Sequence, residues 1–464
     1  MKRFWLLSLL MAVSLVTLQV PAFAADEDAT EDMNSALGSI KGQVTGIDAA
    51  VKGIGLYGDV RVKYSWKTQS GVANAAGTAQ VIPDQDNEQI RARIGVKKTL
   101  GDVTLNLRLV TDATANYPNS QTPSLGDALA DQPVYFDTAS LAWTPGFLNK
   151  QVSVGGGKFQ NVLDYTPITW DDTLTQDGAW VSFNLPDTNT TLRSVYIDYA
   201  NPQATKYTPV LTPPVVEGPA GTNGANNSVD SYIWTTQLSQ LLKFDKDTNL
   251  NITLGYEYIP YVTQINALLT AGGVSGNNLT ADGMVLDYGS VIPDIQLGEV
   301  ILTLNNSFGA DLPAKWTLHA IDNMNSFNLP NAYLQNTAIA GAPKSTGYSN
   351  LSNNMGYWFS VDLGKGGDSP AKDTFTEQLA VAYVEPNAQL SVLTDHDGNF
   401  TNTEYLRSKF NFGLENGVSL QWKTWVAYHV YYEPTIGDTT TANKLASGNQ
   451  TAEWINFFYA TASF

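Results

Sequence analysis

From Gly55 onward, apolar and polar residues alternate along short stretches of the chain. In residues 56–66, valines and aromatic residues alternate with Asp59, Arg61 and Lys63. The same alternation recurs in residues 89–97, 103–109 and 250–258. A period of two places successive side chains on opposite faces of a β-strand. The pattern predicts strands with one apolar and one polar face, which suit a half-buried soluble sheet as well as a barrel wall.

The connections between these stretches separate the two possibilities. Short turns are expected at residues 98–102, 145–150, 186–190, 244–249, 309–313, 364–372 and 415–417. Long polar loops are expected at residues 67–87, 114–133, 201–229, 260–294, 323–354 and 433–451. Strict alternation of short turns and long loops is typical of barrels that span the bacterial outer membrane. We therefore predict an all-β fold, an antiparallel transmembrane β-barrel of about 16 strands (range 14 to 18), formed by residues 55–464.

Composition supports a membrane barrel over a soluble protein. Charged residues make up 15% of the chain and aromatic residues 11%, whereas a soluble domain carries about a quarter charged residues. A strand face that contacts lipid cannot be charged, which explains the deficit. The net charge of −18 makes nucleic acid an unsuitable partner. No cysteine is present, which excludes disulfides and thiol chemistry.

Residues 1–24 have the pattern of a secretory signal peptide. Lys2 and Arg3 precede an apolar stretch, residues 4–20, and Ala22-Phe23-Ala24 supplies the small residues of a cleavage site. An uncleaved membrane anchor is the alternative. Cleavage after Ala24 would remove two positive charges and change the net charge from −18 to −20. No later apolar run is long enough for a transmembrane helix.

Residues 25–54 predict a short periplasmic helical segment. Apolar residues recur with spacings of 4, 3, 4, 3 and 4, at Met33, Leu37, Ile40, Val44, Ile47 and Val51. This heptad seam would suit a coiled coil that joins barrels into a homotrimer. Gly38, Gly42 and Gly46 oppose it, since each costs about 1 kcal/mol of helix propensity relative to Ala. A partly ordered amphipathic tether remains the alternative.

Two stretches resemble known families. The chain ends WINFFYATASF (454–464) and resembles outer-membrane porins of Gram-negative bacteria, with Ala462 departing from the large residue usual there. The resemblance implies that Phe464 is the signal read by the barrel-assembly machinery, and that lipid and lipopolysaccharide surround the barrel. In residues 86–183, the segments RARIG (91–95), RLVTD (108–112), VYFD (134–137), GK (157–158) and WDD (170–172) resemble a family of putative porins. It implies the same fold and a channel function.

Strand parity predicts a basic wall inside the pore. Positively charged residues lie opposite the apolar, lipid-facing positions near both ends of the barrel sequence, and barrel closure would bring the two sets together. The expected pore-lining residues are Arg61, Lys63, Arg91, Arg93, Lys97, Arg108, Arg407, Lys409 and Lys423. The alternative is that these charges merely satisfy one another in a wide, wet pore.

An acidic loop is expected to face this wall. Residues 160–176, between the fifth and sixth strands, carry Asp164, Asp171 and Asp172, and Asp177 follows. The porin resemblance implies that this loop folds into the lumen and forms the constriction. A cationic wall opposite acids would create a transverse field that orients dipolar solutes. The carboxylates could instead bind cations at the lipopolysaccharide surface.

Other chemistry is poorly supported by the sequence. The segment Gly155–Lys158 lacks the spacing of a phosphate loop, and residues 395–399 lack that of a calcium loop. The only histidines, His319, His396 and His429, are widely separated, and no nucleophile motif surrounds a serine. We therefore expect no catalytic residue, no metal site and no cofactor.

The leading functional hypothesis is an outer-membrane porin through which small polar solutes and ions diffuse, with weak anion preference or near neutrality. A solute-specific channel, for example for saccharides, is the nearest rival, because aromatic residues share the inward parity: Tyr57, Trp180, Tyr196, Trp358, Trp425 and Tyr431. An outer-membrane lipase or protease would need a nucleophile motif. A non-conducting structural or adhesive barrel would show the same strand pattern.

Overall fold

The computed structural model describes residues 53–73, 79–111, 134–200, 231–260, 295–308, 312–324, 354–367, 370–385, 388–389, 393, 403–415, 417–429 and 452–464. Apart from Gly53 and Ile54, these residues belong to one unit, Gly55–Phe464. The predicted signal peptide lies outside the described residues, as does the predicted helical segment up to residue 52.

The described residues form sixteen β-strands and two 3₁₀ turns. The strands are β1 (Ile54–Ala73), β2 (Ala79–Leu100), β3 (Val103–Thr111), β4 (Val134–Trp143), β5 (Val152–Gln160), β6 (Thr175–Leu185), β7 (Thr190–Ala200), β8 (Ser231–Lys243), β9 (Asn249–Ile259), β10 (Ile295–Phe308), β11 (Leu312–Asn323), β12 (Met355–Gly364), β13 (Phe375–Val384), β14 (Thr403–Glu415), β15 (Val418–His429) and β16 (Ala452–Ser463). Within the described ranges, no helix has the length and apolar character needed to cross a membrane.

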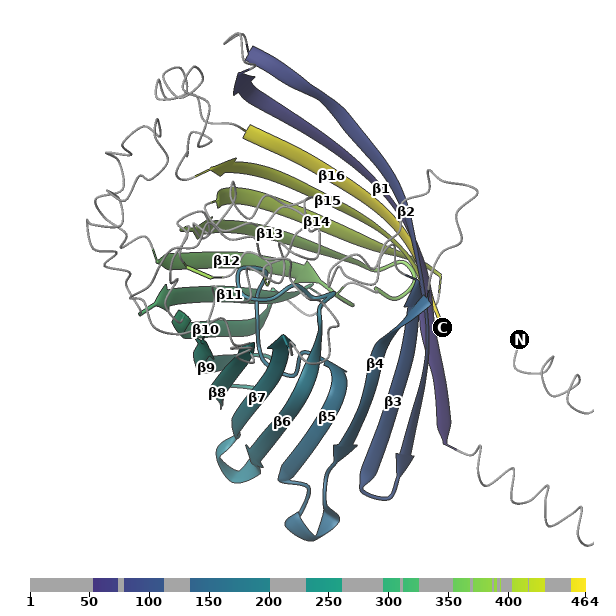
Figure 1. Cartoon of the computed structure of the whole chain (residues 1–464), viewed down its shortest axis with the longest axis vertical. Helices are drawn as coiled ribbons and strands as arrows, with labels where there is room; N and C mark the ends of the chain where they lie inside the picture. Colours follow the sequence, from purple (N-terminus) through teal and green to yellow (C-terminus); the bar gives the residue numbers. More distant parts are fainter. Residues whose placement is uncertain are drawn as a thin grey trace, which may run out of the picture. The chain divides into compact units, whose positions relative to one another are not determined.

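Each strand pairs with its neighbours in sequence, and β1 pairs with β16, so the sheet closes into a barrel (Figure 1). The closing pair is antiparallel, with Asp59 opposite Ser463 and Arg61 opposite Thr461. The terminal residue completes it, because the Phe464 N–H donates to the Gly58 carbonyl at 3.0 Å. A closed ring leaves no strand edge unpaired, which a barrel in lipid requires. The predicted antiparallel barrel of about 16 strands is confirmed.

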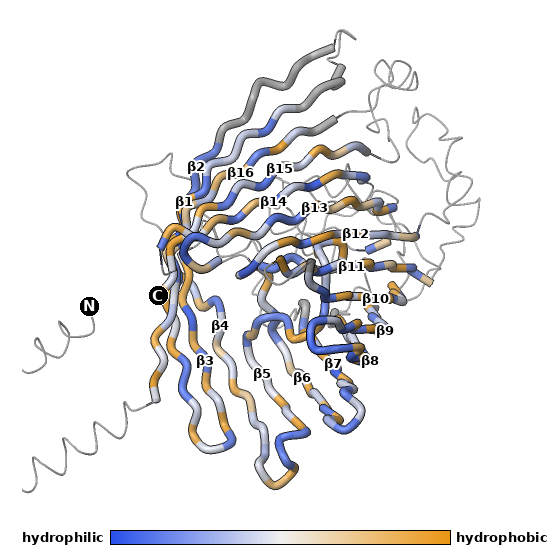
Figure 2. Tube along the Cα trace, turned by 180° about the vertical axis from the view of Figure 1, so that it is seen from behind, coloured by the Kyte–Doolittle hydropathy of each residue, from blue (hydrophilic) through white to orange (hydrophobic). Residues whose placement is uncertain are grey.

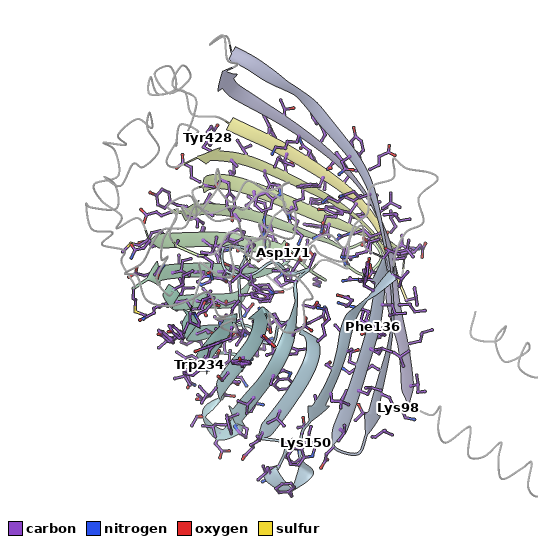
Figure 3. The ribbon with its side chains drawn as sticks, viewed as in Figure 1. Lys98, Phe136, Lys150, Asp171, Trp234 and Tyr428 are labelled. Carbon is purple, nitrogen blue, oxygen red and sulfur yellow. The ribbon has the colours of Figure 1, made fainter. Side chains whose placement is uncertain are left out.

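The short connections fall where the sequence predicts them, at one end of the barrel. Two of them contain 3₁₀ turns, η1 (Gly146–Leu148) and η2 (Pro186–Thr188). Asn149 and Asn189 end these turns with φ of 51° and 52°, a left-handed conformation that asparagine tolerates better than most residues. Lys98 and Lys150 mark this end in Figure 3.

One predicted loop is wrong. Residues 67–87, expected to be a long polar loop, are mostly strand, because β1 continues to Ala73 and β2 already begins at Ala79. The polar and small residues of this region conceal the period of two, so the sequence pattern stops before the strands do. The β1–β2 hairpin is consequently the longest strand pair described (Figure 1).

Alternation of side chains sets the two faces of the wall. Val62, Tyr64 and Trp66 are exposed on the outside, whereas Lys63 between them is buried inside. Figure 2 shows the same alternation of hydrophobic and hydrophilic positions along neighbouring strands. Phe136, Trp234 and Tyr428 likewise lie on the outer face (Figure 3). The outer surface is apolar, as contact with lipid requires.

Part of the barrel interior is nevertheless apolar. Buried aliphatic residues from β7 to β13 form one cluster with two segments that enter the barrel, and the cluster includes Ile168, Val195, Ile197, Ile233, Ile259, Ile295, Leu297, Ile321, Val384 and Leu393. Ile168 is fully buried, and burying such a side chain contributes about 1.5–3 kcal/mol. The cluster holds segment 161–174 against this side of the wall and positions the functional site.

Candidate functional site

Segment 161–174, which joins β5 to β6, is anchored inside the barrel by Asp164. Its carboxylate lies 3.1 Å from the Arg193 guanidinium of β7 and accepts hydrogen bonds from Thr253 of β9 at 2.8 Å and Ser239 of β8 at 3.0 Å. Burial alone would raise the pKa of Asp164, but Arg193 and the two hydroxyl groups outweigh it and hold the pKa below its usual value. Three strands of the inner wall therefore bind one ionised carboxylate.

A chain of polar contacts continues from this anchor across the wall. The Gln237 side chain of β8 accepts from the Asp164 N–H at 2.8 Å and donates to the Asp164 carbonyl at 2.7 Å and to Glu299 of β10 at 2.6 Å. Glu299 lies 3.1 Å from His319 Nε2, and Nδ1 of the same ring is 2.8 Å from the Thr166 hydroxyl. Segment 161–174 is thus held at two points by β7–β11.

The segment also has its own local structure. The Thr166 carbonyl accepts from the N–H groups of Thr169 and Trp170, and the Asp171 carboxylate accepts from the N–H and hydroxyl of Thr173. The Asp171 N–H donates to the Leu393 carbonyl at 2.7 Å. Figure 3 places Asp171 within the ring of strands. A second segment, represented by Ala388, Gln389 and Leu393, therefore enters the barrel as well.

The nine predicted basic residues share one arc of the wall, which runs through β14, β15, β16, β1, β2 and β3, but they fall into two groups. On β2 and β3 they are ion-paired: Asp59 accepts from Arg91 at 3.0 Å and from Arg93 at 2.7 Å, and Asp137 pairs with Arg108. Lys97 is exposed nearer the short-turn end. Asp59 and Asp137 thus balance part of the charge of this half within the wall.

On β1, β14 and β15 the basic residues lie over aromatic rings. The Arg61 guanidinium is 5.0 Å from the Tyr459 ring centroid, and Lys63 Nζ is 4.4 Å from that of Phe457. Arg407 lies between Trp358 and Trp425, at 4.6 and 4.8 Å, and Lys423 Nζ is 4.6 Å from the Trp425 ring. Cation–π contacts of this kind are worth about 0.5–2 kcal/mol each. We call these four cations and the rings that they contact, those of Tyr459, Phe457, Trp358 and Trp425, the cation–aromatic wall.

A cavity of about 740 Å³ separates segment 161–174 from the wall. Tyr165, Pro167, Trp170 and Asp172 line it from the segment, and Arg407, Lys409 and Lys423 line it from β14 and β15. Lys315, Asp362 and Asp247 complete its charged lining, and Asp247 belongs to a short turn. The cavity thus lies on the short-turn side of the segment. Asp172 lines it from the segment, whereas Asp362 lies in the barrel wall, directly opposite Lys315.

The four predicted constriction acids have different positions. Asp172 faces the cavity, Asp164 binds β7–β9, and Asp171 is buried. Asp177 was expected beside them, but it lies on β6 next to the inward-facing Gln176 and points outward, where it pairs with Lys158 at 2.9 Å. Strand alternation forces this orientation, so only Asp172 opposes the basic residues directly.

Several functional residues escape the sequence analysis. Asp59 alternates with apolar residues in the same way as Arg61 and Lys63, so the sequence pattern alone could have placed it on the inner face. His319, Glu299 and Gln237 carry no such signal, because their role depends on contact with a distant segment. Tyr196, expected inside, is 45% exposed on the outer face. The inner face of β7 carries the apolar residues Val195 and Ile197, which reverses the usual assignment.

Comparison with known proteins agrees with this architecture. Residues 59–270 match the model of a protein family described as "Putative porin". The chain is similar to putative porins over this region. The matched part contains the ion-paired half of the basic arc, all of segment 161–174 and its anchors on β7–β9. The match and the closed barrel together support an outer-membrane channel.

The chain is also similar to solved structures of proteins from several bacteria. Pseudomonas putida OprB is 10% identical, with a TM-score of 0.49 and coverage of 90% of this chain and 96% of that one. Salmonella typhi OmpF is 11% identical, with a TM-score of 0.42 and coverage of 89% and 97%. Pseudomonas aeruginosa OpdL is 11% identical, with a TM-score of 0.41 and coverage of 89% and 98%. No curated protein matches the chain.

Within the described ranges, no group of three or more histidine and carboxylate side chains is arranged to hold a metal ion. His319 instead bridges Thr166 and Glu299. His396 and the side chain of His429 lie outside the described residues, as do residues 395–399.

Proposed function

We propose that this barrel is a water-filled channel for the passive diffusion of small polar solutes and ions across the outer membrane. The cavity of about 740 Å³ between segment 161–174 and β14–β15 carries this proposal. It lies inside a closed barrel and is lined by charged groups, which favour water over lipid. Segment 161–174 narrows the lumen there, so the groups on its two sides control what passes.

The same groups support a weak preference for anions. Asp172 faces Arg407, Lys409 and Lys423 across the cavity, and such opposed charges produce a transverse field. Four cations, Lys315, Arg407, Lys409 and Lys423, line the cavity together with three acids, Asp172, Asp247 and Asp362. On β2 and β3, Asp59 and Asp137 compensate two of the three arginine charges. The net charge of the whole chain matters less, because exposed charges farther than a Debye length of about 8–10 Å are screened.

Single-channel recording in planar bilayers tests the channel function. Purified protein without its first 24 residues should give stepwise, stable, ohmic openings. Its reversal potential in a salt gradient should indicate near neutrality or a slight preference for anions. A complete lack of conductance from protein shown to be folded in the membrane would contradict the channel and favour a structural barrel.

A saccharide channel is less well supported. Such channels need exposed aromatic faces for stacking, but Trp358 and Trp425 are 2% and 0% exposed and have Arg407 between them. Tyr57 is engaged by Asn106, to which its hydroxyl donates. Trp358 and Trp425 therefore serve to support Arg407.

We further propose a biogenesis route from the sequence patterns. The chain would be exported to the periplasm, cleaved after Ala24, and inserted among lipid and lipopolysaccharide by barrel-assembly machinery that reads Phe464. The heptad seam of residues 33–51 would then join three barrels. Channel openings in groups of three that become single when residues 25–52 are removed would support the trimer, and unchanged groups of three would contradict this role of the segment.

A further inference from the structure

Arg407 is held more rigidly than a diffusion pore requires. Its guanidinium lies between two indole rings. One belongs to Trp425, the residue directly opposite Arg407 on β15, and the other belongs to Trp358 of β12. Its Nη2 donates to Gln378, whose amide group in turn donates to Asp362 at 2.6 Å. Arg407 is 5% exposed, and it lines the cavity. A fixed guanidinium edge matches the geometry of a carboxylate.

Two lysines lie close to Arg407, and they occupy directly opposite positions on neighbouring strands. Lys409 and Lys423 are directly opposite each other on β14 and β15, and both line the cavity. Like charges at directly opposed positions destabilise a sheet. The sequence thus concentrates three cations in adjacent positions on one wall of the cavity, where they attract an anion.

The opposite side of the cavity has a different character. Tyr165 is 38% exposed and lines the cavity together with Pro167 and Trp170, all three from segment 161–174. The segment is fixed by Asp164 and Thr166, so this surface keeps its position. A flat apolar body could stack on it, since ring stacking contributes about 0.5–1.5 kcal/mol beyond the buried area.

We propose that this cavity is a binding site for small organic carboxylates that carry a ring, with the carboxylate at Arg407, Lys409 and Lys423 and the ring against Tyr165. The inference rests on the proposed channel function. The cavity volume of about 740 Å³ falls within the range of about 300–1,000 Å³ typical of small-molecule sites. Asp172, Asp247 and Asp362 also line the cavity and reject a second negative charge beyond the cation cluster. The preferred solutes are therefore ring-bearing monoanions.

Current block by three probes tests the proposal. Benzoate, acetate and benzyl alcohol are added in turn, at equal concentration, to open channels in planar bilayers. Benzoate should give resolved interruptions with a residence time about tenfold longer than either probe that lacks the ring or the charge. Equal block by benzoate and acetate would overturn the ring contact. Equal block by benzoate and benzyl alcohol would overturn the role of the cations.

Matched variants separate the two contacts. Lys423→Gln and Arg407→Gln should each shorten the benzoate residence time by about tenfold or more, as expected for loss of a charge-assisted hydrogen bond. Tyr165→Ala should shorten it for benzoate and leave acetate unaffected. Lys158→Gln removes the same charge from the outer face, where Lys158 pairs with Asp177, and should leave block unchanged.

The possible failures are distinguishable. A protein that gives no openings in potassium chloride alone fails as a channel, and the probes are then not needed. A protein that gives normal openings but shows benzoate block unaltered by Lys423→Gln, Arg407→Gln and Tyr165→Ala remains a channel, and the binding site is refuted. Stepwise openings in each variant verify that it is folded and inserted.

Discussion

Asp59 has a large influence on pore charge for a single residue. The residue is 8% exposed, and its carboxylate binds the guanidinium groups of both Arg91 and Arg93. Arg61 lies on the same face of β1. Removing one partner of a buried ion pair leaves an uncompensated charge, which typically costs about 3–5 kcal/mol. The arginines of β2 and Asp59 therefore have to be considered as one unit.

This unit gives a prediction about ion selectivity. Asp59→Asn should move the reversal potential toward anions, and Arg91→Gln combined with Arg93→Gln should move it toward cations. The triple variant removes two positive charges and one negative charge, so its reversal potential should lie between those of the other two variants and on the cation side of the wild type. Reversal potentials across a salt gradient measure all three. A triple variant with the same reversal potential as the double arginine variant would show that Asp59 does not act on the pore together with Arg91 and Arg93.

Asp164 gives a prediction about pH. Its pKa lies below the usual value of 3.8, so the carboxylate stays ionised and holds segment 161–174 at every pH above that value. The stabilisation from this pairing is present above pH 3.8 and is lost as the pH falls through the lowered pKa. Asp164→Asn should increase current fluctuations at pH 7, with a difference from wild type that persists to about pH 4 and disappears in stronger acid. A difference that vanishes already between pH 7 and 5 would assign the anchor to a group other than Asp164.

The next scale is that of strands and connecting segments, where the sequence predicts some features and misses others. Period-two alternation and short turns identify nearly all strands, because lipid on one side and water on the other impose opposite chemistry on the two faces. The assignment fails where that contrast is absent. The β1–β2 hairpin beyond residue 67 carries few apolar residues. On β16, Phe457 and Tyr459 face inward while Trp454 and Phe458 face outward, so an aromatic strand of this kind gives no readable parity.

The site itself is only partly predictable. The positions of the nine basic residues on the inner face follow from alternation, but their partners do not, since Phe457, Trp358 and Asp137 come from other strands. Segment 161–174 is predicted as an acidic inward loop by resemblance. Its attachment through Thr166, His319 and Glu299 depends on the packing of distant segments, which a pattern in one stretch of sequence does not contain.

Gly157 gives a prediction at the level of the β4–β5 strand pair. Its φ is +106°, and a Cβ atom there would overlap the backbone carbonyl oxygen of Ala139 on β4. Gly157→Ala should lower the free energy of unfolding by at least about 1–3 kcal/mol, through strain and loss of strand pairing. Gly101→Ala is the matched control, because φ is +59° there and no atom lies within 4 Å of the added carbon. Urea unfolding in detergent micelles compares the two, and equal stability losses would contradict the close approach of β4 and β5.

At the scale of the whole barrel, the interior contains one buried cluster and one open cavity. The cluster joins the aliphatic residues of β7–β13 and the inward segments to Trp358, Trp425, Phe457 and Tyr459, and the cavity lies on the short-turn side of segment 161–174. This division explains why a barrel with charged residues inside also contains a hydrophobic cluster. Because packing fixes segment 161–174 against the wall, solutes pass through the part of the lumen that the segment leaves open.

The central claim is that the conducting path lies between segment 161–174 and β14–β15, and thiol labelling tests it most directly. The chain has no cysteine, so single introduced thiols report without background. Lys409→Cys places a thiol on the cavity lining, and Phe410→Cys places one on the outer face, where Phe410 is 37% exposed. A bulky, charged, water-soluble thiol reagent added during single-channel recording should reduce the conductance of Lys409→Cys at once and leave Phe410→Cys unchanged. Unaltered conductance in Lys409→Cys after labelling verified by mass spectrometry would place the conducting path elsewhere and contradict the account.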